Sequence, residues 1–382
     1  MTIAQSAGVA LKDPNKALWL FSPLVPIMAL FYLGLGYWTG QLAFYWAFPV
    51  VIYVFIPVTD WLVGRNTRNP SAALIDAMER DPYYPALVYA FVPFQFIVTG
   101  FGAWVIAMSP PLPWWAIFGL ALSVGVVNGV GFIAAHELTH KKNALDRWLA
   151  KLSLAPTAYG HFFAEHVRGH HKNVATPGDP TSSLLGESFW RYLPRAVLTG
   201  IVSAWRIERD RLQRQGRSTW IPANENLHTW AMTVALFGGL VLWLGWIVFP
   251  FLLAQAAYGI ILLEVTNYIE HYGLLRKKLP NGNYEPCSPA HAWDSNHFVC
   301  TLFLFQLQRH ADHHSNPGNR YQSMRCFDGT PQLPASYVTM MLVAYVPPLW
   351  YRVMDHRVAA HYNGDLSQAH VHPSRRAALG LV

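Results

Sequence analysis

The chain has 382 residues, of which 53% are hydrophobic and only 13% are charged. A soluble globular protein carries about 25% charged residues, so this composition excludes an ordinary soluble domain and predicts an integral membrane protein. Twenty-eight Lys and Arg against 21 Asp and Glu give a net charge of +7. The basic residues follow no nucleic-acid-binding motif, and we expect no nucleic acid partner.

Six stretches are long and apolar enough to cross a bilayer, which takes about 20 residues. The predicted spans lie near 17–38, 42–63, 84–108, 113–135, 229–250 and 252–271. Short turns at 39–41, 109–112 and around 249–250 would pair them into three hairpins. The predicted fold class is therefore all-α and integral to the membrane, with six transmembrane helices.

The distribution of charge predicts the orientation of the spans. With the N-terminus in the cytoplasm, every Lys and Arg falls on the cytoplasmic side or at its interface, as the positive-inside rule requires. We expect a cytoplasmic segment at 1–16, one membrane-embedded domain at 17–360 and a flexible cytoplasmic tail at 361–382. The first apolar stretch is too long for a signal peptide, so we expect it to be retained. The one-sided positive field suits membrane lipid headgroups or an acidic protein partner.

Three segments outside the spans carry local signals. The basic stretch 188–215 predicts a helix, either on the membrane surface or with an ordinary solvated face. The Asn-Gly pair within 278–284 predicts a small hairpin. Residues 334–354 are apolar enough for a buried or interfacial helix, but three prolines argue against a seventh span.

Nine of the 17 histidines stand in four short clusters, all on the predicted cytoplasmic side. They are His136, His140, His166, His170, His171, His271, His310, His313 and His314. Residues three and four apart share a helix face, so His136 and His140 form one pair and His310, His313 and His314 share a second face. By the same rule His166 and His170 pair, with His171 turned about 100° further round. The spans would thus carry these side chains into one histidine-rich cytoplasmic cap.

Nine imidazoles exceed what one ion accepts, so the pattern predicts a dinuclear metal site. Imidazole suits Zn, Cu, Fe and Ni, and the ligand type alone does not name the metal. A zinc peptidase is one alternative, because residues 136–140 read HExxH, but it leaves six histidines without a role. A metal transporter is another, but it would place ligands within the spans.

Acidic residues stand beside the clusters or within the spans. We expect these to orient the ligands through hydrogen bonds rather than bind metal, with Asp60 alternatively pairing with an arginine; they are Glu137, Glu165, Glu264, Glu270, Asp312 and Asp60. His161 and His297 lie near clusters and are further candidates for this role. We expect the remaining histidines to be solvent or interface residues; they are His228, His291, His356, His361, His370 and His372.

The four clusters resemble those of the membrane alkane 1-monooxygenases, in the wider class of fatty-acid desaturases and xylene monooxygenase. The strings that carry the resemblance are HELTHK at 136–141, EHVRGHH at 165–171, NYIEHYGL at 267–274 and LQRHADHH at 307–314. The last two separate alkane hydroxylases from desaturases, and the resemblance covers about residues 50–330. A xylene-type or fatty-acid ω-hydroxylase remains an alternative within this class.

The resemblance implies terminal hydroxylation of medium-chain n-alkanes by O₂ at a non-haem di-iron centre in a bacterial inner membrane. It implies that the nine histidines hold two iron ions, and that rubredoxin, reduced by rubredoxin reductase, supplies electrons. Cys287, Cys300 and Cys326 are too widely spaced to form a CxxC pair, so the electrons come from outside the 382 residues. We expect the alkane to lie end-on between the spans, with bulk at Phe48, Val51 and Phe55 limiting its length.

Overall fold

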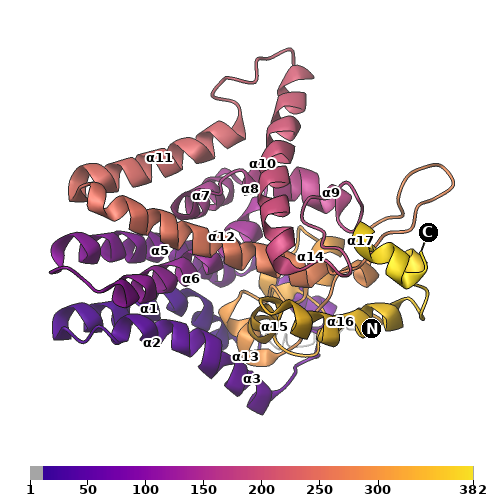
Figure 1. Ribbon diagram of the computed structural model, residues 1–382, viewed down its shortest axis with the longest axis horizontal. Helices are drawn as coiled ribbons and strands as arrows, with labels where there is room; N and C mark the ends of the chain where they lie inside the picture. The colour runs from indigo at the N-terminus through magenta and orange to yellow at the C-terminus, as the bar shows by residue number, and fades with distance from the viewer. Residues whose placement is uncertain (1–11, 382) are drawn as a thin grey trace, which may run out of the picture.

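The computed structural model describes residues 12–381, whose regular secondary structure is helical apart from isolated β-bridges. Six helical stretches in this range are long and apolar enough to cross a membrane, and they run side by side in Figure 1. They are η1 Lys16–Leu20 with α1 Phe21–Thr39; α2 Phe44–Val50, η2 Val51–Phe55 and α3 Ile56–Val63; α5 Tyr83–Met108; α6 Trp114–Thr139; α11 Glu225–Leu244; and η5 Trp246–Val248 with α12 Phe249–His271. The chain is an all-α integral membrane protein, as its composition predicts. Of the expected segment 1–16, residues 1–11 lie outside the described range.

The other helices of the described residues are mostly shorter. They are α4 Ala72–Arg80, α7 Ala144–Leu154, η3 Ala155–Thr157, α8 Phe162–Glu165, η4 His166–His170, α9 His171–Asn173, α10 Phe189–Gln213, η6 Pro289–His291, α13 Phe298–Phe303, α14 His310–Ser315, η7 Tyr321–Ser323, α15 Tyr337–Ala344, α16 Pro347–His361, η8 Leu366–Gln368, α17 Pro373–Arg376 and η9 Ala377–Leu379. The helix expected at 188–215 is α10, which crosses the direction of the spans in Figure 1.

Two central spans, α6 and α12, pack closely enough to fix their ligand-bearing ends. A Cβ added at Gly125 would lie 2.9 Å from the backbone oxygen of Gln255, and one at Gly129 would lie 2.7 Å from Leu262 Cδ1. Small residues of this kind let transmembrane helices approach each other. The buried Asn128 amide also donates to Gln255 Oε1 at 2.5 Å. These contacts hold the ends of α6 and α12 at a fixed distance and register.

Local chemistry explains two irregular points in the spans. Between Pro49 and Pro57, each of which removes a backbone donor, the second span takes a π turn at η2. The fifth and sixth spans are separated at Gly245, where φ is 86°. The turn was expected near Phe249–Pro250, but Pro250 lies in the first turn of α12, where its missing N–H costs nothing.

The C-terminal region differs from the expected flexible tail. Leu185 N donates to His370 O at 2.7 Å, and His372 N donates to Leu185 O at 3.0 Å. Ala369 and Val371 are buried. The apolar stretch 334–354 is divided into α15 and α16 by Pro347, as its prolines suggest. Residues 361–376 are therefore part of the folded cap.

The loop at 278–284 forms the small hairpin that its Asn-Gly pair predicts. Lys278 and Tyr284 make an isolated antiparallel bridge, and Leu279 N donates to Asn283 O at 2.7 Å.

Candidate metal centre

All nine cluster histidines meet at one place and form two groups. Within each group the ligand atoms lie within 4.8 Å of one another. The five-histidine group is His136, His140, His166, His171 and His313; the four-histidine group is His170, His271, His310 and His314. Each group draws on at least three chain segments, so the centre forms only in the folded protein. Seven of the nine side chains are buried, and His140 and His171 are half-buried.

The spacing of the inner nitrogens is that of ligands around an ion. His171 Nε2 lies 3.1 Å from His166 Nε2 and 3.0 Å from His313 Nε2. In the four-histidine group, His310 Nε2 lies 2.9 Å from His314 Nε2. Two nitrogens bound at right angles to one metal at about 2.1 Å would be about 3.0 Å apart. Both groups therefore have a suitable size for a transition metal.

A π turn decides how the EHVRGHH string is shared between the groups. In η4 the backbone N–H of His171 donates to His166 O, an i to i+5 bond. This brings His166 and His171 together in the five-histidine group and sends His170 to the other. The expected i, i+4 pairing of His166 with His170 is wrong, because it assumed a regular α-helix.

Helix α14 also contributes to both groups. His310 and His314 are one turn apart and share the four-histidine group, while His313 joins the five-histidine group. The expectation that all three serve one face is therefore wrong. Adjacent histidines point about 100° apart, so one short helix can bridge two sites.

The outer nitrogens of two histidines have partners that fix their rings. His170 Nδ1 lies 3.0 Å from Asp179 Oδ2, which also accepts the Ser182 hydroxyl at 2.6 Å. His271 Nδ1 lies 3.0 Å from the backbone oxygen of His291. A carboxylate or carbonyl at this position orients the ring and strengthens its inner nitrogen as a ligand.

Asp179 was not predicted, because it lies eight residues past the cluster rather than beside it. The signal that could have located it is the PGDP turn at 177–180, which is separated from the end of the EHVRGHH string by five residues.

Glu270 lies at the inner side of the four-histidine group. Its Oε2 is 3.3 Å from His310 Nε2, the nitrogen that faces the other ligands, and its Oε1 is buried without a hydrogen-bond partner. Glu270 also lines the apolar cavity described below. Glu270 was expected to orient a ligand through the ring nitrogen that faces away from the metal. It lies instead beside the inner nitrogen of His310.

The other acids near the clusters contact no ligand ring. Glu137 lies 3.1 Å from Lys141 Nζ, and Glu264 accepts the Tyr159 hydroxyl at 2.8 Å. Glu165 is buried beside the π turn, where burial, reinforced by the negative charge of Asp179, raises its pKa to about 8. These three acids surround the centre without holding its rings.

Asp312 and Asp60 anchor backbone segments. Asp312 Oδ2 accepts from Arg325 N at 2.7 Å, which ties α14 to the following loop. Asp60 pairs with no arginine; its Oδ1 accepts from Val299 N at 2.8 Å and Cys300 N at 3.1 Å. It thereby attaches the end of the second span to the N-terminus of α13.

The remaining histidines lie outside the two groups. His161 is buried with an unpaired Nε2, and His297 bonds to Ser295 Oγ at 2.9 Å; neither contacts a cluster ring. His291 was expected at the surface, but it is buried and supplies the carbonyl that His271 uses.

The electrostatic surroundings favour neutral imidazoles, the form that binds a metal. Burial, with the positive charge of Lys141, lowers the pKa of His140 to about 3. A neutral imidazole has the free lone pair that a metal needs. The inner nitrogens of His136 and His170 are buried and find no hydrogen-bond partner within residues 12–381, a costly arrangement that a bound metal would satisfy. The residues present therefore fit two metal ions.

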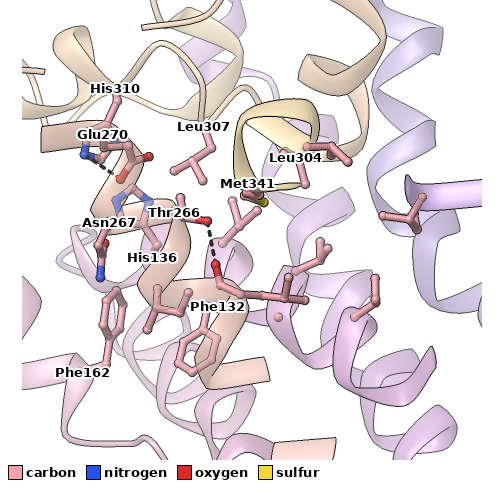
Figure 2. Close-up of a pocket in the computed structure, with 18 of the residues that line it drawn as sticks. Phe132, His136, Phe162, Thr266, Asn267, Glu270, Leu304, Leu307, His310 and Met341 are labelled. Atoms are coloured by element: carbon pink, nitrogen blue, oxygen red, sulfur yellow. Dashed lines mark hydrogen bonds and ion pairs between the residues drawn. The ribbon is translucent and has the colours of Figure 1, made fainter. Parts of the chain in front are cut away.

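An apolar cavity ends at the histidines. Figure 2 shows His136, Glu270 and His310 gathered at one end, with Phe132 and Phe162 further along. The rest of the lining is mainly aliphatic, from α6, α12, α15 and the 304–307 loop. Its shape and chemistry suit a hydrocarbon chain.

The expected channel residues differ from those that line this cavity. Phe48 is fully buried, Val51 is half-buried and Phe55 is 58% exposed, and none of the three lines it. Their neighbours Ile52 and Tyr53 do. The sequence identified the right segment, but the π turn at η2 changes which side chains face inward.

The sequence that carries the histidines matches the fatty acid desaturase class. The sequence pattern of the fatty acid desaturase family matches residues 113–344, which include all nine histidines. Within that class, the chain is 42% identical over 371 residues to the alkane 1-monooxygenase of Acinetobacter baylyi, covering 96% of this chain and 90% of the relative. It is 41% identical over 364 residues to that of Ectopseudomonas oleovorans, covering 95% and 90%. The chain belongs to the alkane 1-monooxygenase family.

A more distant relative is the xylene/toluene monooxygenase hydroxylase component of Pseudomonas putida. It is 28% identical over 341 residues, covering 87% of this chain and 86% of the relative. Membership of this family makes the protein a monooxygenase and removes the peptidase alternative. In the structure Glu137 of the HExxH string is paired with Lys141, and both histidines of that string join three others.

Proposed function

We propose that this protein hydroxylates the terminal methyl group of medium-chain n-alkanes to give 1-alkanols. The alkane, O₂, two electrons and two protons yield the alcohol and one water. The observation that carries the proposal is that two histidine groups close one end of an apolar cavity, in a chain 37–42% identical to alkane 1-monooxygenases.

The proposed cofactor is a pair of iron ions. The five-histidine group would hold one and the four-histidine group the other, with Asp179 orienting His170. Bound iron would supply the redox chemistry that activates O₂, which zinc does not offer. The chain positions the imidazoles, keeps water from the apolar end and places the Glu270 carboxyl group in the cavity wall beside His310.

The cavity supports a substrate of medium length. It follows α6 from His136 to Val126, ten residues that span about 15 Å at about 1.5 Å per residue. An extended alkane advances about 1.3 Å per carbon, given C–C bonds of about 1.5 Å. The cavity therefore matches about 11 or 12 carbons, entered methyl-first toward the histidines.

Electrons must come from a partner. The three cysteines are widely spaced in the sequence, and each is a free thiol. We infer that rubredoxin, reduced by rubredoxin reductase, delivers the two electrons, and that the basic face of the protein attracts this acidic donor.

The orientation and location complete the proposal. The histidine-rich cap and both termini face the cytoplasm, with the protein in a bacterial inner membrane and residues 17–360 as one hydroxylase domain. The absence of Lys and Arg from the short connections at 40–43, 109–113 and 245 supports this orientation.

The test is metal analysis of purified protein together with product analysis. Two irons per chain and 1-octanol from octane, O₂ and a supplied rubredoxin system are expected. Xylene and laurate, assayed in parallel, separate the xylene-type and fatty-acid alternatives. One zinc without iron, or product from xylene or laurate alone, would overturn the proposal.

A further inference from the structure

Arg168 stands at the centre of the π turn η4, between the ligands His166 and His170, and belongs to neither metal group. Its guanidinium turns away from the histidines to meet two acids from other helices. Nη1 lies 3.0 Å from Glu208 Oε1 on α10, and Nη2 contacts Glu225 Oε2 at the start of α11. We name Glu208 and Glu225 the carboxylate clamp.

The clamp is itself held in place. Glu208 is fully buried, binds Arg211 Nε at 2.8 Å and accepts the backbone N–H of Glu225 at 2.8 Å. Glu225 also binds Arg147 at 2.5 Å, on α7. Two fixed carboxylates that grip both arms of one guanidinium define its position more closely than a single ion pair would.

The contacts of Arg168 with the carboxylate clamp would stabilise the π turn η4. π turns are rare and occur mainly at functional sites, because an α-helix is normally preferred. In an α-helix residues five apart point about 140° apart, so relaxation of η4 would separate His171 from His166, while Asp179 still holds His170. The five-histidine group would then lose a ligand.

At Gly169 the turn packs against side chains of both α8 and α10. A Cβ added at Gly169 would lie 2.3 Å from Glu165 Oε1 and 3.0 Å from Ile207 Cδ1. Both atoms are ends of side chains, so a larger residue at this position would have to displace the Glu165 carboxylate and the Ile207 side chain. Sequence and packing therefore agree in fixing the turn from its outer side.

We propose that Arg168 is a positioning residue that sets the composition of the five-histidine site. Through the carboxylate clamp it holds η4 in the π register, which places His171 beside His166. The inference rests on the proposed metal centre. It adds a residue that affects the five-histidine site and leaves the four-histidine site unchanged.

The experiment compares Arg168→Met and Arg168→Lys with the matched control Arg209→Met, in full-length protein. Arg209 lies on α10, is exposed and pairs only with the adjacent Asp210. Iron per chain and the ⁵⁷Fe Mössbauer spectrum are measured, with wild type expected to show two irons and a signal from each site. Arg168→Met is expected to fall to about one iron per chain, with one signal lost and the other unchanged.

Arg168→Lys decides the matter if Arg168→Met does not fold. An ammonium is a point charge that cannot bind both carboxylates as a fork, so partial and selective loss of the same signal is expected. Two irons with unchanged signals in the folded variants, or an equal loss of both signals, would overturn the inference. Absence of iron from the wild type would instead refute the proposed function.

Discussion

A substitution at Val130 tests whether the cavity limits the chain length of the substrate. It lines the cavity on α6, six residues before His136, which places it about 9 Å from the histidines at about 1.5 Å per residue. Val130→Phe would add a ring at that depth and leave room for about seven carbons, at about 1.3 Å per carbon. Hexane should still fit, and dodecane should not.

The size of the effect follows from burial. Each methylene moved from water into an apolar site contributes about 0.8 kcal/mol, or about fourfold in binding. Dodecane would have about five carbons beyond the block and should lose about 4 kcal/mol, or about 10³-fold, relative to hexane. Val126→Phe, about 15 Å from the histidines, should penalise only chains longer than about 11 carbons.

The assay is competition among hexane, octane, decane and dodecane, with 1-alkanols measured by gas chromatography. The control is Leu242→Phe, at an exposed position of α11. Overpacking costs about 1–3 kcal/mol, so thermal stability is measured alongside to separate folding from selection. An unchanged chain-length profile, or equal shifts at positions 126 and 130, would refute a cavity that runs along α6.

Three further predictions follow from the site and its supports. Asp179→Asn should weaken metal binding about 10–100-fold, measured by chelator competition, because His170 loses its carboxylate partner. Asp60→Ala should lower the free energy of unfolding by about 1–3 kcal/mol, measured by thermal denaturation in detergent, since the Val299 and Cys300 amides lose their acceptor. Removal of metal by a chelator should lower the melting temperature, because a metal present at about 100 times its Kd stabilises by about 2.7 kcal/mol per site. An unchanged melting temperature would argue against a metal that binds only the folded protein.

The features that sequence predicted well depend on local pattern. Hydropathy located all six spans to within a few residues, apart from the end of the fifth span and the start of the sixth. The histidine strings identified the nine side chains that converge. Both signals lie within short stretches of sequence. One is the length of an apolar helix, and the other is the presence of residue types that bind a metal.

The features that sequence missed depend on backbone irregularity or on long-range contact. The π turn at η4 moves His171 into the group of His166, and the one at η2 turns Ile52 and Tyr53 inward. Asp179 reaches His170 only after the chain reverses direction. Helical spacing rules assume 3.6 residues per turn, so they cannot anticipate a turn that departs from it.

The dispersal of the ligands along the chain has a consequence for biosynthesis. His136 and His314 close the same centre, although roughly 180 residues separate them. At about 5–20 residues per second, the ribosome needs roughly 9–36 s to pass from one to the other. During that interval His136 and His140 stand at the end of an inserted span with their partners still unmade. Binding of a metal by the complete set of ligands is thus a late event in maturation, and a metal ion that arrives earlier would meet an incomplete set.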